Sequence, residues 1–356
     1  MKVLVTAGGT GGHIMPAVAI AEAIVTGDPG ARILFVGTDR GMEERIAGLK
    51  GLDFIGISAL GIKGKSVTNL LGAVLVNTRA FLKALRIVRD FRPDWVIGTG
   101  GYVTGMVVLA GRITGSTCAI QEQNTIPGLT NRILARVAHR VYLSFPDALG
   151  RFPAARTRLV GNPLRRELTD MRTDGSGNSL LVLGGSLGAG SVNRAAAGAV
   201  RILRDEGVTP DVIHQTGPQD CAWVKEHYEK VGLNVDVRDF IDDMAWAYRS
   251  ARLVVSRCGG ITLAELSCAG LPAIMVPFPH ATDDHQTVNG RYVADRGGGW
   301  LIPDDQLTPE RLALEIRTRL ADPGGLARAS KDMKALGLGA GASRPGTRFE
   351  MHGQSG

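Results

Sequence analysis

Short apolar runs alternate with longer amphipathic stretches along the first half of this 356-residue chain. The apolar runs have the length of strands, and the stretches between them repeat their apolar residues at helical spacing. This alternation predicts repeated β-α-β units on a parallel sheet. The expected strands are Val3–Thr6, Ile33–Val36, Trp95–Ile97 and Thr117–Ile120, and the expected helices are 16–26, 40–48, 103–112 and 128–138.

The pattern pauses at the polar, breaker-rich stretch 170–179 and then starts again. Leu180–Leu183 reads as a strand that leads into glycines and a helix from about Val192, just as the chain begins with a strand, glycines and a helix. Two copies of one Rossmann-like architecture, facing each other across a cleft, are therefore expected. Further strands are expected at Asp211–His214, Val235–Val237, Leu253–Ser256 and Ala273–Val276.

The domain boundary is placed near Gly161-Asn162-Pro163, which gives a first domain at 1–160 and a second at 161–336. Residues 337–356 show neither helical nor strand periodicity. We expect this tail to be disordered.

Composition narrows the class of protein. Hydrophobic residues make up 44% and charged residues 21% of the chain, which is typical of a globular protein. No apolar stretch approaches the roughly 18 residues of a membrane span. The four cysteines are scattered without a Cys-x-x-Cys pair, which favours a reduced, cytosolic chain over a disulfide framework.

The net charge of +7 is unevenly distributed. Residues 1–160 carry 19 Lys and Arg against 10 Asp and Glu, a balance of +9, whereas the remainder carries 22 against 24, a balance of −2. A basic half favours a polyanion or an anionic membrane surface as partner. Nucleic acid is disfavoured, because no RNP-like, zinc-finger or basic-helix signature accompanies the charge.

Residues 8–13 read Gly-Gly-Thr-Gly-Gly-His directly after the first strand. Such a turn points main-chain N–H groups at a ligand where the helix dipole favours negative charge, so a phosphate is expected there. Glycines that merely tighten the turn are the alternative. Neither this loop nor Gly184–Gly190 matches the dinucleotide fingerprint or the Walker phosphate loop, which disfavours nicotinamide dehydrogenases and kinase-type NTPases.

The stretch 253–277 predicts a strand, a helix from about Gly260 and a second strand. The first turn of that helix offers N–H groups to a diphosphate. Glu265 lies about one turn in, where its carboxylate could accept hydrogen bonds from a ribose diol. The alternative for Glu265 is a favourable first-turn acid without a ligand.

A polar segment follows at 277–289. His280, Asp283 and His285 could form a metal cluster, but this is disfavoured because no second ligand group and no Asp-x-Asp motif are evident. Gln286 and Asn289 are three residues apart and would share a helix face, where amide side chains suit sugar hydroxyls. Neither a metal nor a cofactor is expected.

These motifs together resemble the MurG family, the β-N-acetylglucosaminyltransferases of peptidoglycan synthesis. The resemblance covers about 290 residues and rests on seven motifs in one order: Gly8–His13 with Pro16, Gly98-Thr99-Gly100-Gly101-Tyr102, Gln121-Glu122-Gln123-Asn124, Gly161-Asn162-Pro163-Leu164-Arg165, Gly184-Gly185-Ser186, Phe240-Ile241-Asp242-Asp243-Met244, and residues 257–289. It implies an α/β protein of the GT-B fold, with an acceptor- and membrane-facing first domain and a UDP-GlcNAc-binding second domain. The implied enzyme moves N-acetylglucosamine from UDP-GlcNAc to the C4 hydroxyl of the muramoyl sugar of lipid I, with inversion, and so forms lipid II.

The resemblance also assigns binding residues. Ile241 would hold uracil through its backbone, and Glu265 would hold the ribose. The diphosphate would be bound by Gly260, Ile261, Thr262, Ser186 and Arg165, and the sugar by Gln286, Asn289 and Asn124. Thr10, Gly11 and Gly12 are similar to the element that faces the acceptor's diphosphate.

Inversion by direct displacement needs a base for the acceptor hydroxyl and stabilisation of the departing UDP. Helix dipoles and Arg165 can stabilise that charge without a metal. His13 is the first candidate base, because imidazole commonly accepts protons near neutral pH. A histidine that only orders the loop is its alternative, and Glu122 is the second candidate base.

Because lipid I is membrane-bound, the basic first domain is expected to attach peripherally to the cytoplasmic face of the membrane. In residues 70–89, apolar positions are interleaved with Arg79, Lys83, Arg86 and Arg89. A core-packed helix with a solvated basic face is the alternative. Partners among other cell-wall synthesis proteins are compatible with this role.

Three other functions remain open from the sequence. A UDP-GlcNAc 2-epimerase would share the fold and the donor but needs no lipid acceptor. Another lipid-directed GT-B enzyme would differ in its acceptor. A non-catalytic nucleotide-sugar sensor would bind UDP-GlcNAc without turnover.

Overall fold

The computed structural model describes residues 1–9, 11–39, 41–59, 67–147, 149–169, 171, 177–185 and 188–339, with the backbone alone for 67–74. Within these residues the chain forms two compact units, Met1–Arg166 and Glu167–Gly339. Each unit is described by itself below. The expected residues Thr10 and Ser186, and residues 340–356 of the expected tail, lie outside the described residues.

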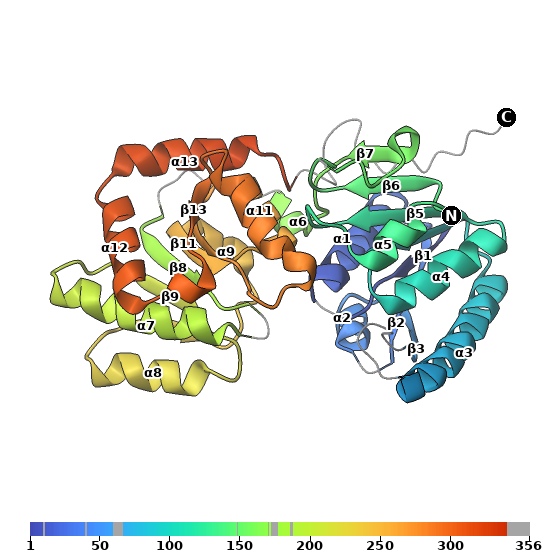
Figure 1. Cartoon of the computed structure of the whole chain (residues 1–356), viewed down its shortest axis with the longest axis horizontal. Coiled ribbons are helices and arrows are strands. Elements are labelled where there is room, and N and C mark those ends of the chain that lie inside the picture. The colour runs from blue at the N-terminus through green and yellow to red at the C-terminus, as the bar shows by residue number, and fades with distance from the viewer. Residues whose placement is uncertain are drawn as a thin grey trace. The chain divides into compact units, whose positions relative to one another are not determined.

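The first unit contains a sheet of seven parallel strands in the order β3-β2-β1-β4-β5-β6-β7 (Figure 1). The strands are β1 (Lys2–Thr6), β2 (Arg32–Thr38), β3 (Asp53–Ile57), β4 (Trp95–Gly98), β5 (Thr117–Glu122), β6 (Arg140–Leu143) and β7 (Thr157–Leu159). The helices of this unit are α1 (Gly11–Gly27), α2 (Glu43–Leu49), α3 (Val67–Phe91), α4 (Tyr102–Ile113), α5 (Leu129–Leu134) and, at its end, the first residue of α6 (Arg166–Thr169).

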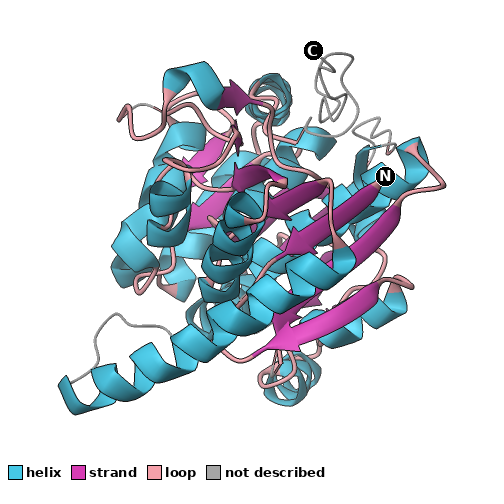
Figure 2. Ribbon diagram, turned by 90° about the vertical axis from the view of Figure 1, so that its right-hand side faces the viewer, coloured by secondary structure: helices cyan, strands magenta, loops and turns pink. Residues whose placement is uncertain are grey.

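Both faces of this sheet are apolar, as parallel strands covered on two sides require. Along β1, Val3 and Val5 pack in one buried cluster with residues of α1 and α2. Leu4, which points to the other face, packs in a second cluster with residues of α3, α4 and α5. The long helix α3 runs along the outside of the unit (Figure 2).

The second unit contains six parallel strands in the order β10-β9-β8-β11-β12-β13. The strands are β8 (Ser179–Leu183), β9 (Val212–Gln215), β10 (Asp236–Arg238), β11 (Ala251–Arg257), β12 (Ala273–Val276) and β13 (Gly299–Leu301). The helices are α7 (Gly190–Asp205), α8 (Cys221–Lys230), α9 (Met244–Ser250), α10 (Gly260–Ala269), α11 (His285–Ala294), α12 (Pro309–Leu320) and α13 (Pro323–Ala335). Counted from its own first strand, this sheet repeats the order 3-2-1-4-5-6 of the first, which is the Rossmann order.

The end of the described chain packs on the second unit. Helix α12 packs against α7, and α13 packs against α10 and α12. Leu338 is buried, and its N–H donates to Ser267 Oγ at 3.1 Å. The chain is therefore packed as far as Leu338, two residues into the segment expected to be disordered.

Some elements differ from the sequence-based expectation. Helix α1 begins at Gly11 rather than at residue 16. Glycine has a low helix propensity and proline is common as a first helical residue, so the sequence favoured a helix start at Pro16. Helix α5 ends at Leu134 rather than at 138. Four strands were not expected: β3, β6, β7 and β13. Three of these, β3, β7 and β13, lie at sheet edges, where burial is partial and the apolar pattern is weak.

Candidate functional site

The expected site residues of each unit gather where the parallel strands end. In each sheet the strand order reverses between two neighbouring strands, which are β1 and β4 in the first unit and β8 and β11 in the second. Ligands of open α/β sheets bind in the crevice at this switch point. The glycine turns after β1 and β8 and the start of α10 after β11 all lie at these ends.

Two glycine segments of the first unit lie against each other. Gly8 N donates to Gly100 O at 3.1 Å, and Gly9 N donates to Glu43 Oε1 at 3.2 Å. Gly101 has φ 91°, and a Cβ there would lie 2.3 Å from Gly8 O. Only backbone fits at this contact, so the close approach of two backbone segments accounts for the glycine at residue 101. Gly11 and Gly12 then form the first turn of α1, whose N–H groups would suit an anion.

His13 is the third residue of α1 and is half-buried. Its Nδ1 lies 3.0 Å from Gln123 Oε1. The imidazole occupies the space that a side chain at residue 100 would fill, since a Cβ on Gly100 would lie 2.6 Å from Nδ1. Thr99 Oγ1 donates to His13 O at 2.8 Å and fixes the helix start beneath the ring.

Glu122, the last residue of β5, is buried and 1% exposed. Its Oε1 accepts from Asn124 N at 3.0 Å and Asn124 Nδ2 at 3.4 Å. Its Oε2 accepts from Gly128 N at 3.1 Å and Asn131 Nδ2 at 3.0 Å. The carboxylate thus fixes the loop between β5 and α5, and Asn124 is held by the same group.

In the second unit, helix α10 starts at the end of β11 with Gly259, which has no side chain, as its N-cap. Gly260, Ile261 and Thr262 form the first turn. No acidic residue lies in that turn. Its N–H groups and the positive end of the helix dipole therefore suit a diphosphate.

Glu265 lies one turn into α10 and is half-buried. Its Oε2 accepts a hydrogen bond from the buried Tyr248 hydroxyl at 2.7 Å. Ile241 is buried, and its N–H donates to Gln215 Oε1 at 3.1 Å. Its N–H is therefore engaged within the protein, and its carbonyl is the backbone group that could accept from a ligand N–H.

Both amides expected to address the sugar bind the turn after β11. Gln286, near the start of α11, accepts with Oε1 from Cys258 N at 3.2 Å and from Phe278 N at 3.0 Å. Asn289 is fully buried, and its Nδ2 donates to Cys258 O at 3.1 Å. Gln286 thereby keeps its amide N–H₂ as the group that can meet a ligand oxygen.

Arg165 lies directly before α6, and its Nε is buried with no hydrogen-bond partner among the described residues. A buried guanidinium nitrogen without a partner is costly, and an anionic ligand oxygen would relieve that cost. Thr10 and Ser186 cannot be placed, since both lie outside the described residues.

The sequence analysis assigned no role to several polar residues that lie at these sites. They are Thr99, Gln121, Gln123 and Asn162 in the first unit, and Gln215 and Tyr248 in the second. Four of them lie inside or next to the motifs quoted above. Amide side chains at the end of an apolar strand could have indicated them, because a buried polar group there must have a hydrogen-bond partner.

Two general properties concern the whole described chain. Among the residues that the structure describes, no three His, Cys, Asp or Glu side chains are grouped to hold a metal ion, so His280, Asp283 and His285 do not form such a cluster. None of the helices in the described ranges is long and apolar enough to cross a bilayer.

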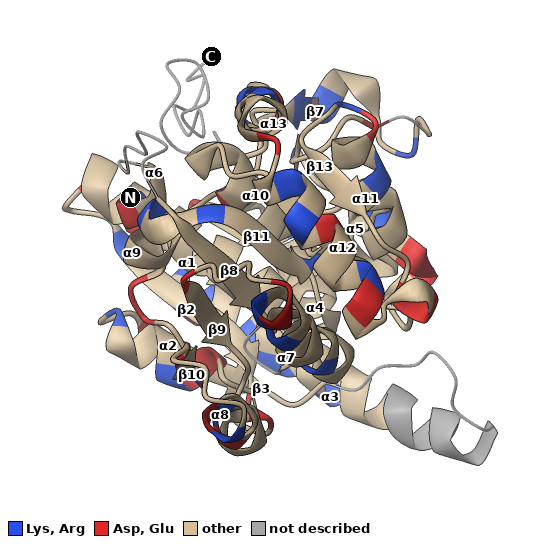
Figure 3. Ribbon diagram, turned by 90° about the vertical axis from the view of Figure 1, so that its left-hand side faces the viewer, with Lys and Arg blue, Asp and Glu red and all other residues tan. Residues whose placement is uncertain are grey.

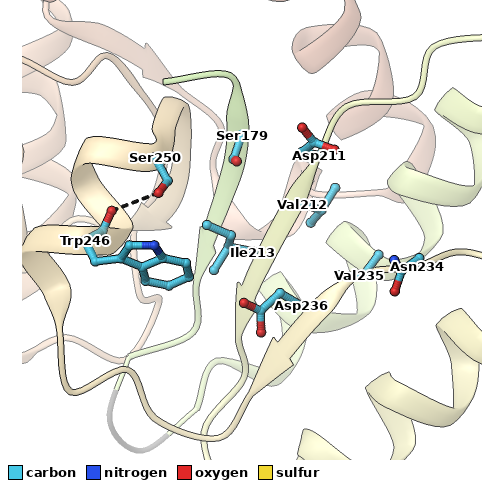
Figure 4. Close-up of a pocket in the computed structure, with 9 residues that line it drawn as sticks. All are labelled: Ser179, Asp211, Val212, Ile213, Asn234, Val235, Asp236, Trp246 and Ser250. Atoms are coloured by element: carbon cyan, nitrogen blue, oxygen red, sulfur yellow. Dashed lines mark hydrogen bonds between the residues drawn. The ribbon is translucent and has the colours of Figure 1, made fainter. Parts of the chain in front are cut away.

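A cavity of about 330 Å³ lies at the opposite, amino-terminal edge of the second sheet (Figure 4). Ser179, Val212 and Asp236, the first residues of β8, β9 and β10, line it together with Trp246. Since the expected donor residues follow the carboxyl ends of the strands, this cavity is separate from them.

Comparison with known proteins identifies the class. The Glycosyltransferase family 28 N-terminal domain matches residues 3–143, and the Glycosyltransferase family 28 C-terminal domain matches residues 179–341. The UDP-N-acetylglucosamine--N-acetylmuramyl-(pentapeptide) pyrophosphoryl-undecaprenol N-acetylglucosamine transferase of Myxococcus xanthus is 41% identical over 341 residues, which are 95% of this chain and 89% of the relative.

Solved structures agree. The crystal structure of Acinetobacter baumannii MurG superposes with a TM-score of 0.77 at 32% identity and covers 94% of both chains. The UDP-GlcNAc 2-epimerase of Neisseria meningitidis has a TM-score of 0.62 at 12% identity, covering 95% of this chain and 96% of its own, and shares the fold alone.

The fold and the matches together define a glycosyltransferase of the GT-B fold class. The chain belongs to glycosyltransferase family 28 and, within it, to the MurG family. The fold class and the family expected from the sequence are thereby confirmed.

Proposed function

We propose that this protein transfers N-acetylglucosamine from UDP-GlcNAc to the C4 hydroxyl of the muramoyl sugar of lipid I and so forms lipid II. The observation that carries the proposal is 41% identity, over 95% of the chain, to a transferase whose name gives this donor and this lipid-linked acceptor. The alternative of an epimerase rests on a fold shared at 12% identity. A transferase also uses the basic first unit, which an epimerase does not need.

The second unit binds the donor in this proposal. The first turn of α10 takes the diphosphate, Glu265 takes the ribose, and the carbonyl of Ile241 takes the uracil. Arg165, which lies at the end of the first unit, is proposed as a further ligand of the diphosphate. Tyr248 supports the proposal for Glu265, because its hydrogen bond orients the carboxylate. Gln286 donates to a sugar oxygen through its amide nitrogen, because its Oε1 is engaged by two backbone N–H groups.

The first unit activates the acceptor. The acceptor oxygen attacks the anomeric carbon and forms the new C–O bond, while the bond to UDP breaks and its electron pair leaves with the diphosphate. His13 takes the hydroxyl proton in this step. We prefer His13 to Glu122 as base, because both oxygens of Glu122 already accept hydrogen bonds from the loop that it fixes.

The test of this function is UDP release from UDP-GlcNAc with and without a soluble lipid I analogue. We expect release only with the acceptor, and a disaccharide product with a β linkage. Release without acceptor supports the epimerase-like alternative, and UDP-GlcNAc binding without release supports a sensor; either result contradicts the proposal.

Peripheral attachment to the cytoplasmic face of the membrane is proposed to use α3. Leu75 and Leu82 are 54% and 59% exposed, although both are large and apolar. Arg79, Lys83 and Arg86 are exposed on the same helix, which carries its buried residues Ala80 and Ala84 toward the core. Exposed leucines between basic residues suit the interface of an anionic bilayer. In the second unit, by contrast, acidic and basic residues are mixed over α7, α8 and α12 (Figure 3).

Sedimentation with phosphatidylcholine vesicles, with and without phosphatidylglycerol, tests this attachment. Replacing Arg79, Lys83 and Arg86 by Ser should weaken binding to the anionic vesicles by about 100-fold, at about 1 kcal/mol for each basic residue. A matched control replaces the exposed Lys225, Lys230 and Arg328 of the second unit by Ser. Equal losses in both variants would contradict a specific role of α3.

A further inference from the structure

Gln123 follows directly after β5 and is 1% exposed. Its Oε1 lies 3.0 Å from Nδ1 of His13, the half-buried histidine that follows the first glycine loop. Neither the family motifs nor the expected site residues assign it a role. Which of its two amide atoms faces the imidazole decides where the proton of a neutral ring lies.

The other amide atom of Gln123 is identified by its surroundings. Its Nε2 lies 2.7 Å from Thr99 O and 3.2 Å from Gln121 O. Backbone carbonyl oxygens only accept hydrogen bonds, so the atom that faces them must be the N–H₂ group. Oε1 therefore faces His13, and because this oxygen only accepts, Nδ1 must donate.

A second buried amide fixes the first. Gln121 is fully buried, and its Nε2 donates to Ser144 Oγ at 2.8 Å, Asn162 Oδ1 at 3.1 Å and Glu122 O at 3.2 Å. The oxygen of Gln121 is thereby directed at Gln123 Nε2, which donates to it. Turning either amide over would place two oxygen atoms against each other in a buried site.

These side chains form one directed line of hydrogen bonds. It runs from His13 Nδ1 to Gln123, from Gln123 to Gln121 and from Gln121 to Asn162, and Asn162 Nδ2 donates in turn to Gln123 O at 3.3 Å. In the three hydrogen bonds from His13 to Asn162, the donor always lies on the side of His13. The line connects the first glycine loop with the Gly161-Asn162-Pro163 segment.

We propose that Gln123 is a positioning residue that holds neutral His13 with its proton on Nδ1, so that Nε2 keeps the lone pair that receives the proton of the acceptor hydroxyl. The role of Nε2 in the reaction rests on the proposed function, whereas the tautomer rests on the hydrogen bonds alone. The partner of the second ring nitrogen commonly sets which nitrogen of a histidine is protonated. Gly100 contributes by leaving room for the ring in this orientation.

The tautomer is measured directly by NMR of protein labelled with ¹⁵N-histidine, with His13 assigned by the signals that disappear in His13→Ala. We expect Nδ1–H in the wild type, a shift toward Nε2–H in Gln123→Met, and retention of Nδ1–H in Gln123→Glu, whose side chain can still accept from the ring. Nε2–H in the wild type, or an unchanged tautomer in Gln123→Met, would overturn the proposal.

Kinetics separate positioning from a structural role. Gln123→Met should lower kcat by ~10–100-fold with little change in KM for UDP-GlcNAc, and Gln123→Glu should restore part of the loss. In a His13→Ala background, Gln123→Met should cost nothing further, because the group that it positions is gone. An equal loss in both backgrounds would overturn the proposal. Absence of any transfer by the wild type would contradict the proposed function, while the NMR result would still decide the role of Gln123.

Discussion

The two units repeat one strand order, yet different chemistry holds the glycine turns that follow their first strands. In the first unit the buried carboxylate of Glu43 accepts from Gly9 N. In the second unit main-chain carbonyls accept instead: Gly184 N donates to Gln215 O at 2.7 Å, and Gly188 N donates to Gly185 O at 3.2 Å. The topology is repeated, whereas the groups that hold the turns are not.

This difference fits a division of labour. In the first unit Glu43 holds the glycine turn through Gly9 N, and Gln123 contacts the imidazole of His13. In the second unit, α10 begins with glycine and without an acidic first turn, which favours an anion. In the proposed function, the repeated topology serves proton transfer in one unit and diphosphate binding in the other.

The largest effect is expected from the carboxylate of Glu122. Glu122→Ala removes the acceptor of four donor groups, on Asn124, Gly128 and Asn131. It should lower the free energy of unfolding by about 4 kcal/mol, since each unsatisfied group costs roughly 1–3 kcal/mol. Urea denaturation measures this. The control is Glu206→Ala, whose ion pair with Arg317 is exposed and is worth at most about 1 kcal/mol. Equal shifts in the two variants would contradict a special role for the buried carboxylate.

A pair of glycines sharpens the comparison between the turns. Gly100→Ala places a Cβ against the imidazole and should lower kcat by ~100-fold, as misplaced catalytic groups do. Gly185→Ala meets no atom within 4 Å and bears only the strain of φ +75°, so it should cost about 1–2 kcal/mol of stability and little activity. The comparison fails if Gly185→Ala reduces transfer as much as Gly100→Ala does.

The buried His214 of the second unit, which contacts Tyr228 and Asn193, predicts acid sensitivity. Burial lowers the pKa of His214 to about 3, against the effect of Asp220, from an ordinary value of 6.5. Below pH 6.5 the unfolded chain binds a proton that the folded chain does not, so stability is complete above that pH and falls as pH drops toward 3. Between pH 6.5 and 5 the loss should be about 2 kcal/mol, at 1.36 kcal/mol per pH unit. His214→Gln should flatten this slope in urea denaturation at several pH values, and parallel slopes for both proteins would refute it.

The smallest effects concern two helix ends with left-handed backbone. Arg92, after α3, has φ 52°, whereas Gly270, after α10, has φ 66°. Arg92→Gly should raise the free energy of unfolding and Gly270→Ala should lower it, each by about 1 kcal/mol. Thermal unfolding of both variants checks these opposite signs, and shifts of the same sign would show that contacts rather than backbone strain dominate.

Much of the fold was predictable because parallel strands buried on both faces give continuous apolar runs, as in β1 and β12. The edge strand β3 escaped because only one of its residues is buried. For the candidate site, the motifs predicted which segments lie at the carboxyl ends of the strands. Sequence could not show that Gln286 binds the backbone with one amide atom, or that Gln123 meets His13, because both contacts join segments far apart in the chain.

The most direct test of the division of labour is equilibrium binding of UDP-GlcNAc to wild type, His13→Ala and Glu265→Ala, measured beside acceptor-dependent UDP release. We predict that His13→Ala binds the donor like the wild type but loses transfer by ~10²–10⁴-fold, and that Glu265→Ala loses donor affinity. Loss of donor binding in His13→Ala, or full transfer by it, would contradict the account.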